Sequence, residues 1–429
     1  MNVTGDSIHE LGELFAGFTD VRKGKNCHYM MRDIVMSGFS LFHMQCPSFL
    51  HFQRRVLEQK GRSNCQTLYG MTDIPTDNHI RTVLDAVDPI EVEPGFDHVL
   101  KKLEKGGGLK DFQRLGSHVL VALDGTQHFS STSIKCACCL RRKHKNTPPE
   151  YYHSMVSATL VAPGHTKVIP LMPEFIRNED GSEKQDCERN ATKRWFSRHG
   201  TRLQPLKPLY LGDALLGCQP ICETVLLYGG HYIFTSKPEA HKTLYDFIEG
   251  CAFSRHTTVM TQGKRKVTQH TYHYRWIQGV PLRDGKDALL TNWLELEIKD
   301  EQGKTTFRRA LITDLPLSCA ETVVEIMVCW RARWKIENET FNVLKNHGYN
   351  LEHNFGHGKK FLAMTLAALN LLAFAIHTVS DIMDQLWQKA RSCMNARRTL
   401  FEHLRSLVVY ALYDSWTALL TFVGPLPES

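Results

Sequence analysis

The stretch "GSHVLVALDG", residues 116–125, joins a dense apolar run to an acid and a glycine. A short continuous apolar run of this kind predicts a buried strand, with Asp124 near its end. A second stretch, "PLKPLYLGDALLG" at 205–217, has the same design and places Asp213 after its apolar run. A helical pattern around 186–199 separates the two. Strands that alternate with helices predict an α/β core.

A third acid stands out in "RWKIENETFNVLK", residues 333–345, which has the pattern of a continuous helix. Arg333 and Glu337 lie four residues apart and therefore share one helix face. They form either a surface ion pair, worth about 0.3–0.5 kcal/mol, or a metal-binding carboxylate beside a phosphate-binding cation. Three carboxylates, Asp124, Asp213 and Glu337, suit divalent metals that prefer oxygen ligands. Two such metals can clamp the attacking and leaving oxygens of phosphoryl transfer.

Taken in order, "LDGT" around Asp124, "LGD" at Asp213 and "WRARWKIENETFNVLK" at 330–345 resemble the DDE transposases of bacterial insertion sequences. The resemblance is to the group with a Tyr-x2-Arg-x3-Glu-x6-Lys signature. It covers nearly the whole chain, because three further segments also resemble that family: "IPTDNHIRTVLD" (74–85), "KPEAHKTLYDFI" (237–248) and "GYNLEHNFGHG" (348–358).

The resemblance implies a ribonuclease-H-like core in which Asp124, Asp213 and Glu337 bind two Mg²⁺, with Mn²⁺ as a substitute. It implies a cut-and-paste transposase that nicks the terminal inverted repeats of an element and joins them to target double-stranded DNA. The working form would be a homodimer on DNA, in the bacterial cytoplasm at the nucleoid. Two alternatives are an inactive or domesticated relative that only binds DNA, and a ribonuclease-H-like nuclease without strand transfer.

Two signature positions depart from the pattern. Arg333 and Glu337 match it, and the resemblance implies that Arg333 and Lys345 hold the DNA strand at the cleavage point. Lys345, however, comes one residue later than the signature requires. Trp330 stands where the signature has Tyr and lacks a phenolic hydroxyl, so it is either a DNA contact or a core aromatic.

The resemblance also implies a β-rich domain between the second Asp and the Glu. The chain matches this with an interval that has no acidic residue between Glu249 and Asp284. The expected regions are a helical DNA-binding region at 1–115, the first part of the core at 116–249, a basic β-rich insertion at 250–317, the second part of the core at 318–379, and a helical C-terminal region at 380–429.

Several basic and aromatic residues are candidates for DNA contact. Lys264, Arg265 and Lys266 lie in the insertion, where "YHYRW" (272–276) alternates as a strand would. Its Trp276 either stacks on an extruded base or packs in the sheet. The basic stretch 184–207, which contains Arg194, is either a phosphate-tracking helix or a solvated helix face. The net charge of +7 permits a nucleic-acid partner.

A cluster in "CACCLRRKHKNTPPEYYH", 136–153, offers metal ligands. Cys136 and Cys139 have CxxC spacing, and His144 and His153 follow. The set is either a structural tetrahedral Zn²⁺ site or a group of free thiols. Thirteen cysteines without an export signal predict a reducing compartment. The apolar run at 361–376 is shorter than the roughly 18–20 residues of a membrane span, so we expect a buried helix and no membrane partner.

Overall fold

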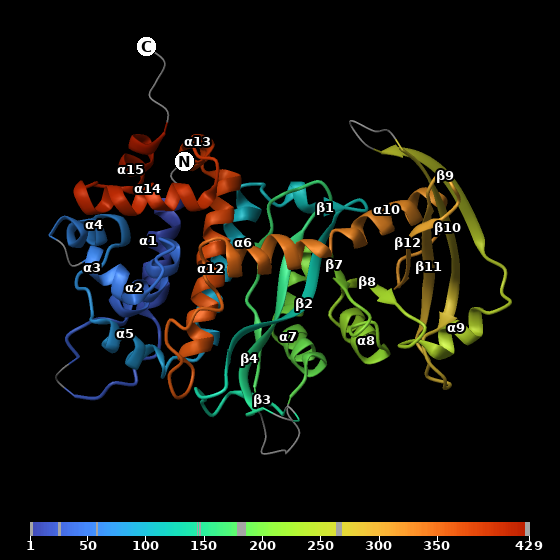
Figure 1. Cartoon of the computed structure of the whole chain (residues 1–429), viewed down its shortest axis with the longest axis horizontal. Coiled ribbons are helices and arrows are strands. Elements are labelled where there is room, and N and C mark those ends of the chain that lie inside the picture. The colour runs from blue at the N-terminus through green and yellow to red at the C-terminus, as the bar shows by residue number, and fades with distance from the viewer. Residues whose placement is uncertain are drawn as a thin grey trace, which may run out of the picture.

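A computed structural model describes residues 3–24, 27–56, 59–143, 145, 147–177, 186–262 and 268–424. Its helices and strands divide into a helical body, a central sheet region and an antiparallel extension of the sheet at the far end (Figure 1). Asp124 and Asp213 lie in the central sheet region.

The sheet is mixed, and its strands follow the order β3-β4-β2-β7-β8-β12-β11-β10-β9. Its first part consists of β2 (His118–Ser131), β3 (Leu140–Arg142), β4 (Glu150–Val161), β7 (Pro208–Gly212) and β8 (His231–Ser236). Of three short strands, β1 (Gln113–Arg114) pairs with β2, and β5 (Ile169–Pro170) and β6 (Glu174–Ile176) pair with β4. β2 runs antiparallel to β4 and parallel to β7, and β7 runs parallel to β8. The apolar run of β2 is buried because this strand is central and covered on both faces.

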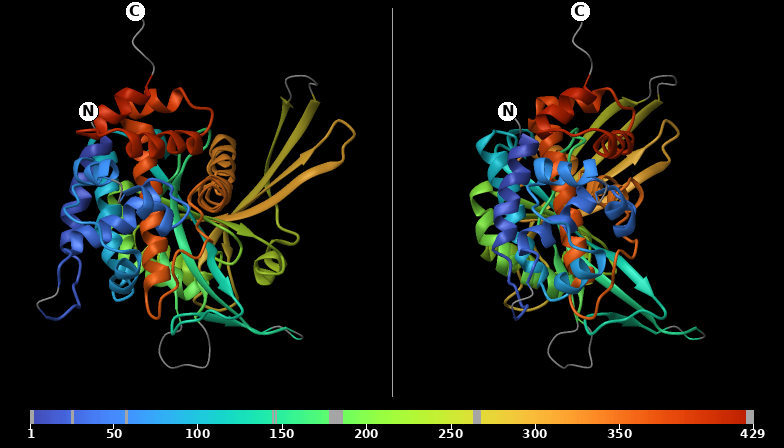
Figure 2. Two further views of the ribbon diagram at one scale, coloured as in Figure 1. Left: turned by 60° about the vertical axis from the view of Figure 1, so that its left-hand side comes forward. Right: turned by 90° about the vertical axis from the view of Figure 1, so that its left-hand side faces the viewer.

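Four antiparallel strands extend the sheet beyond β8. They are β9 (Ser254–Gln262), β10 (Thr268–Pro281), β11 (Leu290–Lys299) and β12 (Thr305–Thr313). β12 joins the extension to the core through its antiparallel pairing with β8, from Ala310↔Ser236 to Thr313↔Ile233. Seen from the side, these strands project away from the core as a long twisted ribbon (Figure 2). They occupy the interval between Asp213 and Glu337, where the sequence indicates a β-rich insertion.

The helical body combines both ends of the chain. Its N-terminal helices are α1 (Val3–Ala16), α2 (Met31–His43), α3 (Phe49–Val56), α4 (Gln59–Tyr69), α5 (Asp77–Leu84) and α6 (Glu93–Lys105), and its C-terminal helices are α12 (Leu362–Met383), α13 (Gln385–Ser392), α14 (Arg397–Tyr410) and α15 (Trp416–Val423). α12 packs against α1, α2 and α6 and so holds the two sets together (Figures 1 and 2).

Helix α12 is apolar on all sides, as expected of a helix surrounded by protein. Among the described residues it is the one helix long and apolar enough to cross a membrane, and 94% of its most apolar stretch is buried inside the protein. Asn370, the polar residue within the apolar run, donates a hydrogen bond to the carbonyl oxygen of Tyr349. The expectation of a buried helix at 361–376 is confirmed.

The remaining helices surround the sheet: α7 (Glu188–Leu203), α8 (Gln219–Leu227), α9 (Lys242–Ile248), α10 (Ala320–Arg331), the π-helix η4 (Ile336–Phe341) and α11 (Asn342–Asn346). α7 packs on β4 and β6, and η4 packs on β2 and β4. This packing brings the segment that carries Glu337 to the strand that carries Asp124.

Candidate active site

Two of the three acids meet through the parallel pairing of β2 and β7. The register runs from Val119↔Pro208 to Ala122↔Leu211. Two residues further along each strand, the same register places Asp124 beside Asp213. Neighbouring strands are about 4.8 Å apart, and paired residues point to the same face of the sheet, so the two carboxylates are neighbours. The backbone N–H of Leu215 donates to Asp213 Oδ1 at 2.8 Å and fixes the turn after β7.

The side chain of Arg333 links Glu337 to Asp124. Arg333 Nη1 lies 2.8 Å from Glu337 Oε1 and 3.5 Å from Asp124 Oδ2. One guanidinium nitrogen therefore contacts an acid from the helix and an acid from the strand. The shared face of Arg333 and Glu337 expected from their spacing is present. Arg333 is largely covered and reaches Asp124, whereas the Glu337 side chain stays about half exposed.

The helix that carries Glu337 is not continuous, contrary to the pattern of 333–345. Helix α10 ends at Arg331, and Glu337 lies in the π-helix η4, which α11 follows. A π segment bonds each N–H to the carbonyl five residues earlier, so its turn holds one residue more than an α-helical turn. Lys345, at the end of α11, lies close enough to His128 of β2 to lower the pKa of that imidazole, after the larger effects of burial and His153. Its Nζ also pairs with Glu352 at 2.8 Å.

A fourth carboxylate, Glu188, reaches the same place and was not singled out from the sequence. It lies in the first turn of α7, and a Cβ at Gly125 would collide with its carboxylate. Burial raises the pKa of Glu188 to about 7, and the charges of Asp124 and Asp213 add to this rise. The only sequence signal was the glycine directly after Asp124, because a close approach requires a residue without a side chain.

The charge balance of this site is strongly negative. Burial raises the pKa of Asp124 to about 6; the Arg333 guanidinium opposes the rise, and the charges of Glu337 and Asp213 add to it. Glu337, Asp213 and Glu188 thus all lie near Asp124, and the mutual repulsion of the four acids is relieved either by protons or by a bound cation. Carboxylate oxygens on a rigid sheet edge are the ligands that Mg²⁺ and Mn²⁺ prefer.

Two residues expected to contact DNA are engaged within the protein. Trp330 is almost fully buried, and its indole N–H donates to Thr235 Oγ1 at 3.2 Å. Its surroundings are those of a core aromatic. Arg194 pairs with Glu174 at 2.9 Å and with Asp186 at 2.7 Å. Since Glu174 is buried, Arg194 compensates an internal charge and does not face outward as a phosphate contact would.

Of the two alternatives for Trp276 in the insertion, base stacking and packing in the sheet, the structure shows packing. Tyr272, Tyr274 and Trp276 do share one face of β10, but that face is packed, and the Trp276 indole N–H donates to the carbonyl oxygen of Leu317 at 3.1 Å. An extruded base could stack only on an exposed aromatic face, so this face of β10 is not available for base stacking. Lys264, Arg265 and Lys266 lie outside the described residues.

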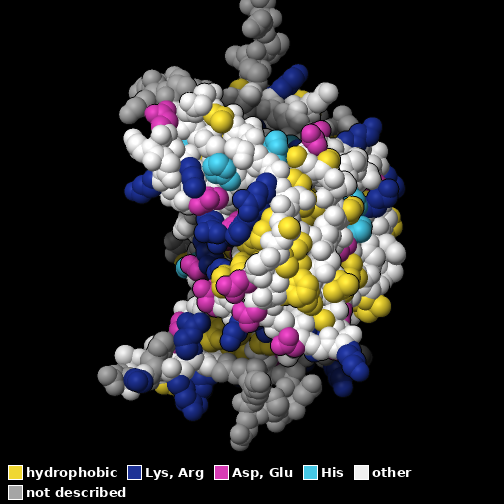
Figure 3. Space-filling view, turned by 90° about the vertical axis from the view of Figure 1, so that its right-hand side faces the viewer, with side chains coloured by type: hydrophobic (Ala, Val, Ile, Leu, Met, Phe, Trp, Pro, Cys, Tyr) yellow, Lys and Arg dark blue, Asp and Glu magenta, His cyan; other side chains and the backbone are white. Residues whose placement is uncertain are grey.

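The opposite face of β10 carries charged residues. Arg275 and Arg308 both bind Glu295, each with a closest contact of 2.6 Å, so part of the positive charge is neutralised within the sheet. Lys and Arg side chains gather on the face of the molecule at the β9–β12 end, beside an apolar stripe (Figure 3).

One further cation approaches the acids. Arg189, next to Glu188 on α7, is exposed, and its Nε donates to the carbonyl oxygen of Leu215 at 3.0 Å. Leu215 is two residues after Asp213, so Arg189 lies at the rim of the acidic site. It belongs to the basic stretch 184–207, for which a phosphate-tracking helix was one of the two alternatives.

The cysteine cluster is partly as expected. Cys136, Cys139 and His153 lie together, and the fourth member of the group is His357. His144, the other expected member, lies outside the described residues. Sequence spacing gave no signal for His357, since it is more than 200 residues away from the other three.

The chain was also compared with known proteins. No family model and no curated protein matches it. Among solved structures, it is similar to the piggyBac transposase in a synaptic complex with hairpin DNA, determined by cryo-EM. The identity is 11%, the match covers 95% of this chain and 79% of that one, and the TM-score is 0.39. A likeness at this level does not assign the chain to a family.

Proposed function

We propose that the protein is a DDE-type DNA transposase that cuts and joins the ends of an insertion sequence by two-metal phosphoryl transfer. The observation that carries this proposal is the convergence of Asp124, Asp213 and Glu337 at one sheet edge, with Arg333 between the strand acid and the helix acid. Double-stranded DNA is the proposed partner, and a homodimer is the proposed assembly on it.

The order of elements supports a ribonuclease-H-like core. Asp124 lies within the central strand β2, Asp213 directly follows its parallel neighbour β7, and Glu337 arrives on a helix packed against β2. The antiparallel extension β9–β12 leaves the core after β8 and returns before α10. Both the acid order and the place of the insertion agree with the fold that the sequence resemblance implies.

Each side chain then has a role in the reaction. Asp124, Asp213 and Glu337 would hold two Mg²⁺, or Mn²⁺ in their place, and these would supply Lewis-acid activation of a water and of the scissile phosphate. Glu188 adds a fourth carboxylate. With its pKa raised to about 7 it would be about half protonated at neutral pH, and a bound cation would favour its ionised form. Arg333 now pairs with Asp124 and Glu337, and it would be available to donate to a phosphate oxygen of the cut strand once cations took over these carboxylates. The 3′-hydroxyl released by the nick is the nucleophile of the joining step.

The π-helix supports a DNA-contacting role for Lys345 as well. Between Glu337 and Lys345 the chain has one residue more than the signature, and the π turn of η4 absorbs one residue more than an α turn. The two differences offset each other. This offset would bring Lys345 toward the position that a residue seven past Glu337 takes on a regular helix.

The experiment uses a supercoiled plasmid that carries the inverted repeats flanking the coding region. Wild-type protein with Mg²⁺ should nick the element ends and form joined products, whereas Glu337→Gln should bind the ends without nicking them. Glu339→Gln, two residues further along the same π-helix, is the matched control and should retain cleavage. Nicks without joined products would favour the nuclease, and DNA binding without nicks by the wild type would favour the inactive relative.

A further inference from the structure

The second cluster of the molecule lies away from the four acids and is built from three separate segments. Cys136 and Cys139 occupy the turn before β3, His153 is on β4, and His357 is in the loop between α11 and α12. Their ligand atoms all lie within 4.8 Å of one another. Three of the four residues are buried, and Cys136 is half-buried.

We propose that Cys136, Cys139, His153 and His357 bind one structural Zn²⁺ that fixes the loop after the Glu337 helix to the β3–β4 edge of the sheet. The inference does not depend on the proposed function, because it rests on this cluster alone.

Five of the six distances between ligand atoms are close to those of a tetrahedral zinc site, and the sixth, from the Cys136 sulfur to His357 Nε2, is within 4.8 Å. Zinc bonds of about 2.3 Å to sulfur and about 2.0–2.1 Å to nitrogen give tetrahedron edges of about 3.8 Å for S···S, about 3.5 Å for S···N and about 3.3 Å for N···N. The Cys136 and Cys139 sulfurs are 3.7 Å apart. His153 Nε2 lies 3.4 Å from each sulfur, and His357 Nε2 lies 3.3 Å from the Cys139 sulfur. The two Nε2 atoms are 3.2 Å apart. Each of these five edges is within about 0.3 Å of the zinc value.

A bound cation explains this arrangement better than hydrogen bonds among the four side chains do. Two sulfurs and two imidazole nitrogens converge on one point, and every atom of the set is within 3.7 Å of at least two others. A thiol or an N–H has one hydrogen and can serve one of these contacts at a time, whereas a central cation serves all four groups at once. A disulfide is excluded by the 3.7 Å separation, since a disulfide bond is about 2.05 Å long.

Groups around the cluster hold the ligands in the required orientation. His357 Nδ1 lies 3.1 Å from the carbonyl oxygen of Gly358, and donation there leaves the Nε2 lone pair directed at the cluster. The backbone N–H of Cys136 donates to the Cys139 sulfur at 3.3 Å, which favours the thiolate form. The ring centroids of Phe129 and His357 lie 4.4 Å apart, so the Phe129 ring covers the cluster on the His357 side. A closed set of two sulfurs and two nitrogens is typical of structural zinc.

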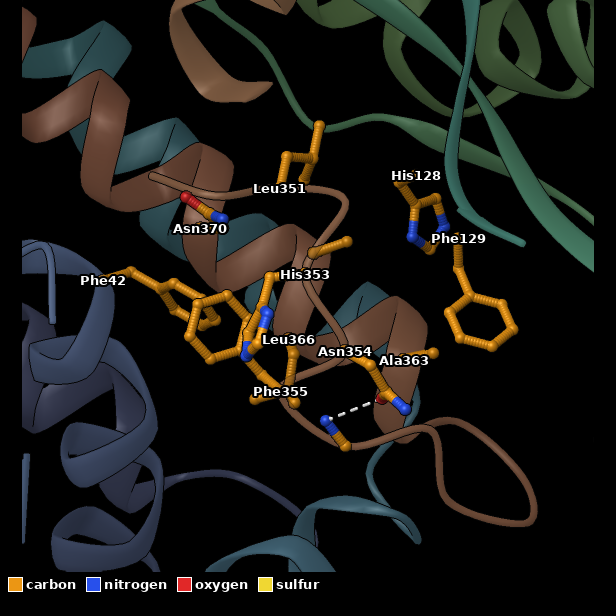
Figure 4. A pocket seen from close by; sticks show the side chains of 12 residues that line it. Phe42, His128, Phe129, Leu351, His353, Asn354, Phe355, Ala363, Leu366 and Asn370 are labelled. Carbon is orange, nitrogen blue, oxygen red and sulfur yellow. Dashed lines mark hydrogen bonds between the residues drawn. The ribbon is translucent and has the colours of Figure 1, made fainter. Parts of the chain in front are cut away.

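The loop that the zinc would hold is important for the Glu337 segment. It begins directly after α11, passes between α12 and the His128–Phe129 end of β2, and borders a small pocket there (Figure 4). Its far end is anchored by Asp85, whose carboxylate accepts the backbone N–H groups of four consecutive residues, 359–362. The zinc would supply the second anchor and thereby join the sheet that carries Asp124 to the chain that leaves Glu337.

The test is the metal content of the purified full-length chain. Wild-type protein should contain about one zinc per chain by elemental analysis, and Cys139→Ser and His357→Gln should each lose it. Cys138→Ser is the matched control, since this thiol lies between the two ligands in sequence, and it should retain the zinc. Cobalt added to zinc-depleted wild type should give the visible absorption of tetrahedral Co²⁺ with thiolate ligands.

The cobalt spectrum keeps the proposal testable when a variant fails to fold, because it is measured on the wild-type sequence. Wild-type protein that contains no zinc and gives no tetrahedral cobalt spectrum would overturn the site. Zinc retained by His357→Gln would overturn the assignment of His357. Neither readout requires DNA cleavage, so failure of the transposase proposal would leave this result unaffected.

Discussion

Replacing Glu188 by Gln tests whether this carboxylate is buried beside Asp124 and Asp213 in the folded protein. In the folded protein burial, with the charges of Asp124 and Asp213, raises the pKa of Glu188 from its ordinary value of 4.5 to about 7. Each unit of pKa shift corresponds to 1.36 kcal/mol. Ionised Glu188 therefore destabilises the metal-free folded state by up to about 3 kcal/mol, and Glu188→Gln should recover most of this.

The stability difference between Glu188→Gln and the wild type depends on pH. Because the folded pKa is raised, the folded state binds the proton more tightly than the unfolded state does, and wild-type stability falls as pH rises from about 4.5 to about 7. Glu188→Gln should match the wild type below pH 4.5 and exceed it above pH 7. With saturating Mg²⁺ at neutral pH the difference should shrink or reverse, because the cation compensates the carboxylates of the wild type.

Thermal melting between pH 4.5 and 8 measures the effect, in buffer free of Mg²⁺ and of chelators so that any zinc is retained. Glu339→Gln is the control, since Glu339 is a carboxylate outside the four-acid group. A Glu188→Gln protein that melts like the wild type at both ends of the pH range would refute the reasoning, because it would mean that Glu188 is not held against the other acids.

Three further predictions concern the remaining parts of the account. Arg194→Ala should lower stability by about 1–3 kcal/mol, as it removes a partner of the buried Glu174, whereas Arg189→Ala should leave the melting temperature unchanged and weaken binding of the element ends. Trp276→Ala should cost about 3–5 kcal/mol in chemical denaturation, as expected for a large side chain removed from a packed face. Mg²⁺ affinity measured by calorimetry should rise between pH 5.5 and 7.5, because burial and the neighbouring acids raise the pKa of Asp124 to about 6 and protons compete with the metal.

The sequence was informative wherever local pattern determines structure. The apolar runs before Asp124 and Asp213 predict strands, and parallel pairing of neighbouring strands is what brings these acids together. The i,i+4 spacing of Arg333 and Glu337 predicts their contact. The alternation at 272–276 predicts that its aromatic residues share a face. All of these follow from the periods of helix and strand.

Features that depend on distant packing could not be predicted in this way. Alternation does not tell which face of β10 is covered, so the sequence alone could not decide whether Trp276 is buried. Glu188 and His357 reach their clusters through tertiary packing of segments that are remote in sequence. The π turn at Glu337 follows from a change of hydrogen-bond partner, which leaves no mark on the apolar pattern.

Metal ligation by the acid triad is the central claim, and sulfur substitution tests it most directly. The measurement is nicking of element ends by Asp124→Cys and by Asp213→Cys, with Mg²⁺ and with Mn²⁺, beside the corresponding Asn variants. Mn²⁺ accepts a sulfur ligand better than Mg²⁺ does, so both Cys variants should be inactive with Mg²⁺ and regain nicking with Mn²⁺, while the Asn variants stay inactive with either metal. Nicking by Asp124→Asn or Asp213→Asn at the wild-type rate with Mg²⁺ would contradict the account.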